Sequence, residues 1–321
     1  MEYRRLGRTG LKVSTICLGT MQFGWSADEP ASYEIMNRAV ELGCNFFDTA
    51  DIYSFWADNN DGGVSEQIIG NWMQKSGIRR QDIVLATKVR GKMGDGPNDE
   101  GLSRQHIMNA VEDSLDRLQT DYIDLYQLHW PDEETPLDET LAALNDLVRS
   151  GMVRYIGCSN YPAWLLMKSL WVSDVKNLVR FDSLQPHYNL MHRAEFEREL
   201  QPLCLDQGIG VIPYSPLGGG FLTGKYRRDT ALPESARADG VRQRYMNEQG
   251  FTAVDKLEEI GKAHHATVAQ TAIAWTLANP AVTSAIIGAN STAQLEDTVK
   301  GAEVKLSAEE KEALDATTAW E

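Results

Sequence analysis

Short apolar runs alternate with longer stretches of helical periodicity along the whole chain. This alternation is typical of a parallel sheet whose strands are joined by crossover helices. Eight of the runs have the length and composition of buried strands, and eight strands close a parallel barrel. The pattern therefore predicts an α/β fold of the (β/α)8 TIM-barrel type. The predicted strands cover residues 16–19, 46–48, 83–88, 122–128, 153–159, 183–185, 210–214 and 285–287.

Several helical segments begin and end at recognisable signals. Thr135 stands as a cap residue before Pro136, and Ser307 with Glu310 forms the pattern of a capping box. Gly43 follows one apolar stripe in the position of a helix-ending glycine. That stripe consists of Ile35, Met36, Ala39 and Val40.

A small hairpin is predicted ahead of the first barrel strand. Residues 3–6 and 11–13 flank a turn at residues 7–10, and we expect this hairpin to plug the floor of the barrel. The chain has no internal repeat and no low-complexity linker, so we expect residues 1–321 to form a single domain. Three stretches are predicted as long loops, which are often functional: residues 54–63, 90–102 and 218–250.

Composition and charge narrow the possible partners. The 321 residues include 31 Lys and Arg against 46 Asp and Glu, which gives a net charge of −15. A negative field of this size opposes binding to nucleic acid or to an anionic membrane surface. No apolar run reaches the roughly 18 residues that a membrane-spanning helix needs. We therefore expect neither partner, while a locally basic pocket for a phosphorylated cofactor remains compatible with the charge.

The four cysteines indicate a reducing compartment. None of them forms a CxxC pair, and all lie in apolar strand-like or helical contexts, as reduced core thiols do. No apolar segment follows the first five residues, so we expect no signal peptide. Together these features predict a cytoplasmic protein. The cysteines are Cys17, Cys44, Cys158 and Cys204.

Four residues with complementary chemistry lie at or just beyond the ends of three successive predicted strands. They are Asp48, Tyr53, Lys88 and His129, and the intervals of 40 and 41 positions between Asp48, Lys88 and His129 suit successive βα units. Parallel barrels place their chemistry at this rim. Each residue alone would be better explained as a solvated or structural side chain. Their joint position favours an active site.

The four side chains suit the reduction of a carbonyl group. Such a reaction requires a proton donor at the oxygen while hydride arrives at the carbon. The Tyr53 phenol can supply that proton, and the Lys88 ammonium would lower its pKa of about 10. The Asp48 carboxylate would hold Lys88 charged and in place. His129 would donate a hydrogen bond to the substrate oxygen and orient it.

Several strings of residues, in this order and spacing, resemble the aldo-keto reductases over nearly the full chain. The resemblance implies a TIM barrel, a nicotinamide cofactor bound without a Rossmann domain, and reversible carbonyl reduction. Consistently, no G-x-G-x-x-G joins a predicted strand to a helix. The matching strings are Gly19-Thr20-Met21, Asp48-Thr49-Ala50-Asp51-Ile52-Tyr53, Thr87-Lys88, Leu128-His129-Trp130-Pro131-Asp132, Gly157-Cys158-Ser159-Asn160, Gln185 with Tyr188-Asn189-Leu190, and Tyr214-Ser215-Pro216-Leu217.

The same resemblance implies a set of cofactor contacts. Tyr214 would stack on the nicotinamide ring, and Ser159, Asn160 and Gln185 would bind its carboxamide; Gln185 can also be an ordinary strand-end polar residue. Residues 219–225 match a phosphate-binding P-loop up to the last position, where Tyr226 replaces the required Ser or Thr, so an NTPase is not expected. Cofactor contacts are also implied for Gly19, Thr20, Met21, Asp48, Ser215, Pro216, Leu217, Gly218, Gly220 and Lys225.

The adenosine end of the cofactor would lie where a predicted loop opens a helix after residue 287. Ser291 with Gln294 also matches a simple capping box. A lysine and an arginine that commonly hold the 2′-phosphate in the family correspond here to Gly288 and Gln294, a pattern shared with the potassium-channel β subunits, which bind NADPH. NADP(H) is favoured and NAD(H) is possible. The implied contacts are Gly288, Asn290, Gln294 and Asp297, with Arg237 as a source of positive charge.

Aromatic residues would surround the substrate pocket in a barrel of this type. Such walls suit apolar or aromatic aldehydes and also the faces of sugars. Scattered aromatics near a rim can equally be loop packing. No His, Cys or carboxylate cluster has metal-ligand spacing, so no metal is expected. The pocket residues are Trp25, Phe55, Trp56 and Trp130.

These features predict an oxidoreductase that reduces an aldehyde or ketone with NAD(P)H, with Tyr53 as the proton donor. The expected partner is a small carbonyl or alcohol substrate. Two alternatives remain open: an NAD-dependent alcohol or sugar dehydrogenase, and a cofactor-binding regulatory subunit similar to the channel β subunits. The sequence gives no indication of the oligomeric state.

Overall fold

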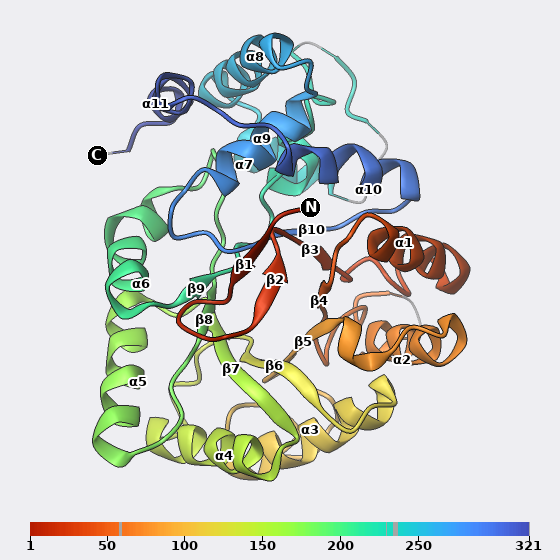
Figure 1. Cartoon of the computed structure of the whole chain (residues 1–321), viewed down its shortest axis with the longest axis vertical. Coiled ribbons are helices and arrows are strands. Elements are labelled where there is room, and N and C mark those ends of the chain that lie inside the picture. Colours follow the sequence, from red (N-terminus) through yellow and green to blue (C-terminus); the bar gives the residue numbers. More distant parts are fainter. Residues whose placement is uncertain (58–59, 229, 234–236, 321) are drawn as a thin grey trace.

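Eight parallel strands form the centre of the protein, in the order β10-β3-β4-β5-β6-β7-β8-β9. The computed structural model describes residues 1–57, 60–228, 230–233 and 237–320. The predicted (β/α)8 barrel is confirmed (Figure 1). The strands are β3 (Ile16–Gly19), β4 (Phe46–Asp48), β5 (Val84–Val89), β6 (Ile123–Leu128), β7 (Val153–Ser159), β8 (Ser183–Gln185), β9 (Gly210–Val211) and β10 (Ala285–Ile287).

Hydrogen bonds between the first and last strands of this order close the barrel. The Thr283 amide donates to the Val211 carbonyl at 2.8 Å, and the Ile286 amide donates to the Pro213 carbonyl at 3.0 Å. Strand β9 is shorter than the predicted 210–214 because Pro213 has no N–H to donate to a ladder. Every residue of β5 and β6 is buried, as in sheets covered on both faces.

Helices surround the barrel and bury its outer surface (Figure 1). A helix follows each strand from β3 to β8, and α8 and α11 form an additional layer over α9. The α-helices are α1 (Glu29–Glu41), α2 (Val64–Ser76), α3 (Arg104–Leu118), α4 (Leu137–Ser150), α5 (Ala163–Lys176), α6 (Gln201–Gln207), α7 (Ala238–Tyr245), α8 (Glu248–Ala263), α9 (Val268–Leu277), α10 (Thr292–Val299) and α11 (Ala308–Thr317). Short turns of other helix types are η1 (Arg80–Asp82), η2 (Phe196–Leu200), η3 (Gly218–Thr223) and η4 (Lys300–Ala302).

Two of the three helix-end predictions are confirmed. Gly43 follows α1 with φ of 84°, and Ser307 forms both bonds of a capping box at α11. The assignment of Thr135 as the cap of α4 is wrong. Pro136 occupies that position, and the Thr135 hydroxyl instead donates to an Asp132 carboxylate oxygen at 2.7 Å.

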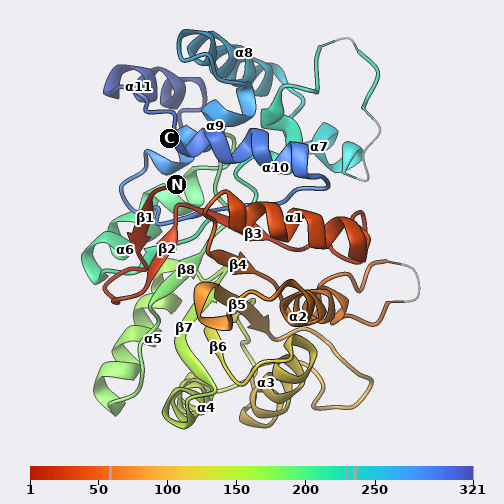
Figure 2. The ribbon, with the colours of Figure 1, turned by 45° about the vertical axis from the view of Figure 1, so that its right-hand side comes forward.

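The N-terminal hairpin is confirmed, and it lies across one end of the barrel. Its strands are β1 (Tyr3–Arg5) and β2 (Lys12–Ser14), and Leu6 and Val13 are buried in the same cluster as the side chains that fill the barrel interior. Figure 1 shows the hairpin in front of the barrel opening, and Figure 2 places it at the left, with α7 at the right. The loops after the strands therefore gather at the end opposite the hairpin.

All four cysteines are buried and unpaired, as predicted for core thiols. Among the described residues, no helix combines the length and apolarity required to cross a bilayer. The region predicted as a loop at residues 218–250 instead contains η3, α7 and the start of α8.

Candidate active site

The structure brings the four predicted catalytic residues together at the C-terminal ends of the strands. Asp48 ends β4, Lys88 lies near the end of β5, and His129 directly follows β6. Tyr53 is placed by a turn after β4, in which Ser54 has φ of 76° and its hydroxyl donates to the Phe23 carbonyl at 2.5 Å. Neighbouring parallel strands therefore supply all four side chains to one rim.

Lys88 is the centre of this arrangement and is completely buried. Its Nζ donates to Asp48 Oδ2 at 2.6 Å, to the Thr49 carbonyl at 2.8 Å and to Tyr53 Oη at 2.9 Å. All three ammonium protons therefore have acceptors. Burial opposes the charge of Lys88, but Asp48 and Tyr53 outweigh it and raise the Lys88 pKa above its ordinary value. Lys88 stays protonated at any physiological pH.

The pKa of Tyr53 differs from the expectation. Burial raises the Tyr53 pKa above its ordinary value, and although Lys88 acts in the opposite direction, the net shift is upward. The phenol is therefore neutral and holds its proton. Because an ammonium is only a donor, the Tyr53 oxygen accepts from Lys88 and its own proton is directed elsewhere.

A pair of glutamines holds Asp48 from the other side. Gln127 Nε2 and Gln185 Nε2 each donate to Asp48 Oδ1 at 2.9 Å, and Gln185 Nε2 also reaches Gln127 Oε1 at 3.2 Å. The sequence interpretation missed Gln127. The available signal was a glutamine inside an apolar strand, because a buried amide needs hydrogen-bond partners. Gln185, assigned to the cofactor carboxamide, directs its amide nitrogen at Asp48 in this structure.

His129 lies close to Tyr53, with 5.8 Å between the ring centroids, and its ring stacks on Trp130 at 3.7 Å. Burial, together with the nearby charges of Lys88 and Arg90, places the His129 pKa well below its ordinary value. The imidazole is therefore neutral at physiological pH. Its Nδ1 is buried and has no hydrogen-bond partner among the described residues.

The predicted pocket aromatics gather at the same rim. The Trp56 ring contacts Trp25 at 5.8 Å, Phe55 at 5.2 Å and Tyr53 at 6.1 Å between centroids. Phe55, Trp56 and Trp130 are 52%, 36% and 40% exposed, so they form an accessible aromatic wall rather than core packing.

The residues assigned to the nicotinamide end also lie together, beside the four predicted catalytic residues. We call those four residues, Asp48, Tyr53, Lys88 and His129, the tetrad. Tyr214 Oη donates to Asn160 Oδ1 at 2.9 Å, and Asn160 Nδ2 donates to Ser159 Oγ at 3.1 Å and to the His129 carbonyl at 3.0 Å. The Tyr214 ring is backed by His187, with 5.2 Å between centroids and 9° between planes. The sequence did not predict this role of His187, because no sequence pattern indicates that one ring stacks on another.

At the end of β3, Gly19 leads into Thr20 and Met21 next to this cluster. The Thr20 amide and hydroxyl both donate to the Asp48 carbonyl, at 3.0 and 3.1 Å. A Cβ on Gly19 would lie 2.7 Å from an Ile286 methyl group, so only glycine fits there.

The segment assigned to the cofactor phosphates is a run of left-handed backbone. Ser215 has φ of 58°, and Gly218, Gly219 and Gly220 have φ of 56°, 67° and 98°. Only glycine adopts such values readily. A Cβ on Gly220 would lie 3.5 Å from Lys225 Nζ, so the ammonium approaches bare backbone. Pro216 and Leu217 connect this segment to Tyr214.

The residues assigned to the adenosine end lie at the start of α10. Asn290 Oδ1 accepts from the Ser26 hydroxyl at 3.0 Å, and the Arg237 guanidinium lies 6.0 Å from the Trp25 ring centroid. The adjacent residues Trp25 and Ser26 therefore connect Arg237 with Asn290. Gln294 Oε1 accepts from the Asn290 amide at 2.9 Å, a local capping role.

Two further positions in this region are constrained by their neighbours. A Cβ on Gly288 would lie 1.8 Å from the Gln22 amide nitrogen, so a larger residue there would require the Gln22 side chain to move. Asp297 accepts from Gln270 Nε2 at 2.7 Å, which ties it to the neighbouring helix α9. Within the described residues, no group of three or more His, Cys, Asp or Glu side chains is placed to hold a metal ion.

Comparison with known proteins agrees with this geometry. Residues 15–319 match the model of the aldo/keto reductase family. The chain is 44% identical to the "Uncharacterized oxidoreductase YrpG" of Bacillus subtilis, over 96% of this chain and 93% of that protein. It is 37% identical to the "Probable voltage-gated potassium channel subunit beta" of Arabidopsis thaliana (95% and 92% covered) and to the "Versiconal hemiacetal acetate reductase" of Aspergillus parasiticus (98% and 96% covered).

Proposed function

The chain belongs to the aldo/keto reductase family and is an oxidoreductase, and we propose that it reduces an aldehyde or ketone to an alcohol by hydride transfer from NAD(P)H. The observation that carries this proposal is the bridge made by Lys88, whose Nζ reaches both Asp48 and Tyr53 in a completely buried position. A purely structural ion pair between Lys88 and Asp48 would not need a phenol as a third member.

The chain's own residues would perform the proton chemistry. Tyr53 would give its proton to the carbonyl oxygen, and Lys88 would stabilise the phenolate that results. Asp48 keeps Lys88 charged during that step. The neutral His129 would donate a hydrogen bond to the same oxygen, and its unpartnered Nδ1 is consistent with a polar ligand at this position. The nicotinamide cofactor supplies the hydride when bound.

The residues around the tetrad fit such a cofactor. Tyr214 presents an aromatic face beside Ser159 and Asn160, and the glycine run with Lys225 forms a backbone cradle of the kind that binds phosphate oxygens. We propose Arg237 and Asn290, joined through Trp25 and Ser26, as the place of a 2′-phosphate, which favours NADP(H) over NAD(H).

Replacement of Tyr53 by Phe tests the reaction. We expect turnover of an aromatic aldehyde such as 4-nitrobenzaldehyde with NADPH to fall at least ~100-fold, the order of a lost general acid. Cofactor binding, measured by quenching of the fluorescence of the eight tryptophans, should persist. Tyr33→Phe, on the outer helix α1, is the matched control. Wild-type turnover in Tyr53→Phe would refute the assignment.

Parallel titrations with NADPH and NADH test the cofactor. NADPH should bind more tightly, and Arg237→Gln should weaken NADPH binding more than NADH binding, because only NADPH has the 2′-phosphate. Arg242→Gln, which removes an exposed arginine from α7, is the control. Equal binding of the two cofactors would instead favour an NAD-dependent alcohol or sugar dehydrogenase.

The similarity to a protein named as a potassium channel β subunit supports a second candidate function, a cofactor-binding regulatory subunit. The two candidates differ in association. Gel filtration of the native protein from its source would show a stable larger complex for a regulatory subunit. Elution without a partner, together with substantial turnover lost in Tyr53→Phe, would favour the enzyme.

A further inference from the structure

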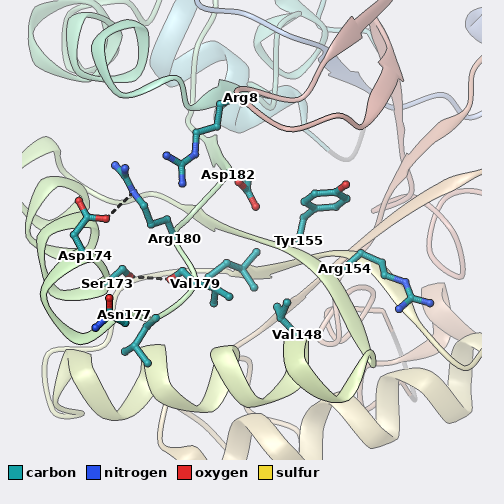
Figure 3. A pocket seen from close by; sticks show the side chains of 12 residues that line it. Arg8, Val148, Arg154, Tyr155, Ser173, Asp174, Asn177, Val179, Arg180 and Asp182 are labelled. Atoms are coloured by element: carbon teal, nitrogen blue, oxygen red, sulfur yellow. Dashed lines mark hydrogen bonds and ion pairs between the residues drawn. The ribbon is translucent and has the colours of Figure 1, made fainter.

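A cavity lies at the end of the barrel opposite the tetrad. Its volume is about 670 Å³, which is within the range of small-molecule sites. Ile156, Leu178 and Val179 give it an apolar side, and Arg8, Arg180 and Asp182 give it a charged side (Figure 3). None of the residues assigned to the substrate or cofactor lines it, so it is separate from the site described above.

Arg8 is presented to this cavity by a rigid turn. Its backbone amide donates to the Gly208 carbonyl at 2.9 Å, and the Thr9 hydroxyl fixes the turn through the Leu6 carbonyl at 2.7 Å. Figure 3 shows the Arg8 side chain extending from the hairpin towards Arg180 and Asp182. In the part of the chain that the structure describes, its guanidinium makes no hydrogen bond or ion pair. The Arg8 guanidinium is therefore held at the cavity with no direct ion pair, and only the longer-range attraction of Asp182 offsets its charge.

Arg180 provides a second guanidinium that is only partly satisfied. Its Nη2 donates to Gln207 at 2.8 Å and its Nε lies 3.5 Å from Asp174, but Nε is buried and lacks a proper hydrogen bond. The remaining arginine of the lining, Arg154, donates to the Gly151 carbonyl and lies on the Tyr122 ring at 4.5 Å. The Arg154 guanidinium therefore already has partners, and Figure 3 shows it turned away from Arg8 and Arg180.

Asp182 faces these cations but neutralises them only in part. Burial raises the Asp182 pKa to about 6, against the opposing effect of Arg8 and Arg180. Near neutral pH the carboxyl is therefore partly protonated, and below that it becomes a hydrogen-bond donor. A positive centre thus persists on the surface of a chain whose net charge is −15.

From this geometry we propose that the cavity binds a small organic anion, with a carboxylate or phosphate head between Arg8 and Arg180 and an apolar body against Val179. Guanidinium groups pair with both head groups through forked hydrogen bonds. The apolar wall gives the body of the ligand a surface to bury, which a free inorganic ion would not use. Carboxylate and phosphate groups share this chemistry, and binding measurements with each show which of the two the cavity prefers.

Isothermal titration calorimetry with benzoate, phenyl phosphate, inorganic phosphate and neutral benzyl alcohol tests the proposal. Wild-type protein should bind benzoate or phenyl phosphate more tightly than inorganic phosphate, and benzyl alcohol least. Arg8→Gln should weaken that binding about tenfold, and Arg8→Lys less, because the charge is kept. Arg5→Gln, in the same hairpin but outside the cavity, should bind as wild type does.

Acidity provides an independent readout. Benzoate should bind more tightly at about pH 5.5 than at about pH 8, because protonation of Asp182 removes the nearest negative charge. The other charged groups around it are Arg8, Arg154 and Arg180, and Asp174 on α5. Equal losses in Arg8→Gln and Arg5→Gln, or binding by wild type of none of the four probes, would overturn the proposal. Turnover at the tetrad would be unaffected by either result.

Discussion

At the scale of single residues, the new feature is the amide pair that holds Asp48. Gln127→Leu removes one of the two donors to Asp48 Oδ1 and also the acceptor of Gln185. A lost hydrogen bond to a charged group is worth about 1.5–3 kcal/mol, and each 1.4 kcal/mol is a factor of ten in rate. We expect kcat to fall at least ~10-fold while the affinity for NADPH changes little.

Steady-state kinetics with a control at Gln67 checks this positioning role. Gln67 is exposed on α2, so Gln67→Leu should leave kcat unchanged. A role limited to stability would lower the melting temperature of Gln127→Leu without lowering kcat per folded molecule, and that outcome would contradict the prediction.

A second residue-scale prediction concerns Asp51, which is fully buried under the turn that holds Tyr53. Its Oδ1 accepts from the Ile52 amide at 2.6 Å, its Oδ2 has no partner among the described residues, and burial with the nearby Glu66 raises its pKa to about 7. The folded state thus binds a proton that the unfolded state releases near pH 4. Stability should therefore fall as pH rises from about 4 to about 7 and then level off.

Asp51→Asn removes this charge. We expect the variant to gain stability relative to wild type at about pH 8.5, by about 1–3 kcal/mol, and to gain much less at about pH 5, where the wild-type carboxyl is already protonated. Urea unfolding at both pH values measures the difference. An equal effect at both values would mean that the carboxyl does not titrate in this range.

The meeting of the tetrad side chains at one rim could be predicted from the sequence for a definite physical reason. The residues after successive parallel strands must meet at one rim, so order and spacing were sufficient for Asp48, Lys88 and His129. The direction of the shift in the Tyr53 pKa could not be obtained this way. It depends on how strongly burial of the phenol, which raises the pKa, opposes the effect of Lys88, which lowers it. Gln127 was missed because its partners are 79 and 58 positions away in the chain.

At the scale of elements, strands were predicted more accurately than the segments between them. The bounds of β3, β4 and β10 agree with the predictions because short, fully buried and mainly apolar runs define them. Residues 218–250 were predicted as a loop because their glycines and charged residues interrupt the apolar pattern that would indicate helix α7. Its buried residues, Val241 and Tyr245, are too few to give a clear apolar stripe.

The left-handed run in η3 gives an element-scale prediction. Gly220→Ala places a Cβ at φ of 98°, next to Lys225, where it is strained and would cover the exposed backbone. We expect a loss of about 1–2 kcal/mol in stability and weaker NADPH binding, by about tenfold. Gly240→Ala in α7, where a Cβ meets nothing within 4 Å, should be neutral or stabilising. Fluorescence titration and thermal unfolding test both variants. Unchanged NADPH affinity in Gly220→Ala would mean that this segment does not contact the cofactor phosphates.

At the scale of the whole molecule, the two ends of the barrel have different roles. The tetrad, the aromatic wall and the glycine run gather at the C-terminal ends of the strands, whereas the hairpin and the cavity beside Arg8 occupy the opposite end. This division follows from parallel strands, because every crossover returns the chain to the same starting end. Changes at the floor should therefore affect stability and leave the chemistry intact.

Gly7 tests that separation. A Cβ at this position would lie 2.5 Å from the Gly208 carbonyl oxygen, 2.6 Å from the Gly210 nitrogen and 2.7 Å from the Asp182 carbonyl oxygen. Backbone atoms cannot move aside as a flexible side chain can, so Gly7→Ala should withdraw the hairpin and its Leu6 plug from the barrel. We expect the free energy of unfolding to fall by about 2–4 kcal/mol.

Gly10→Ala, in the same turn, is the matched control, because a Cβ there meets nothing within 4 Å. Urea unfolding should place Gly7→Ala well below wild type and Gly10→Ala within about 0.5 kcal/mol of it. Turnover per folded molecule should be the same in all three proteins, since the tetrad lies at the far end. If Gly7→Ala were as stable as Gly10→Ala, the hairpin would not seal the barrel; if its turnover fell per folded molecule, the two ends would be coupled.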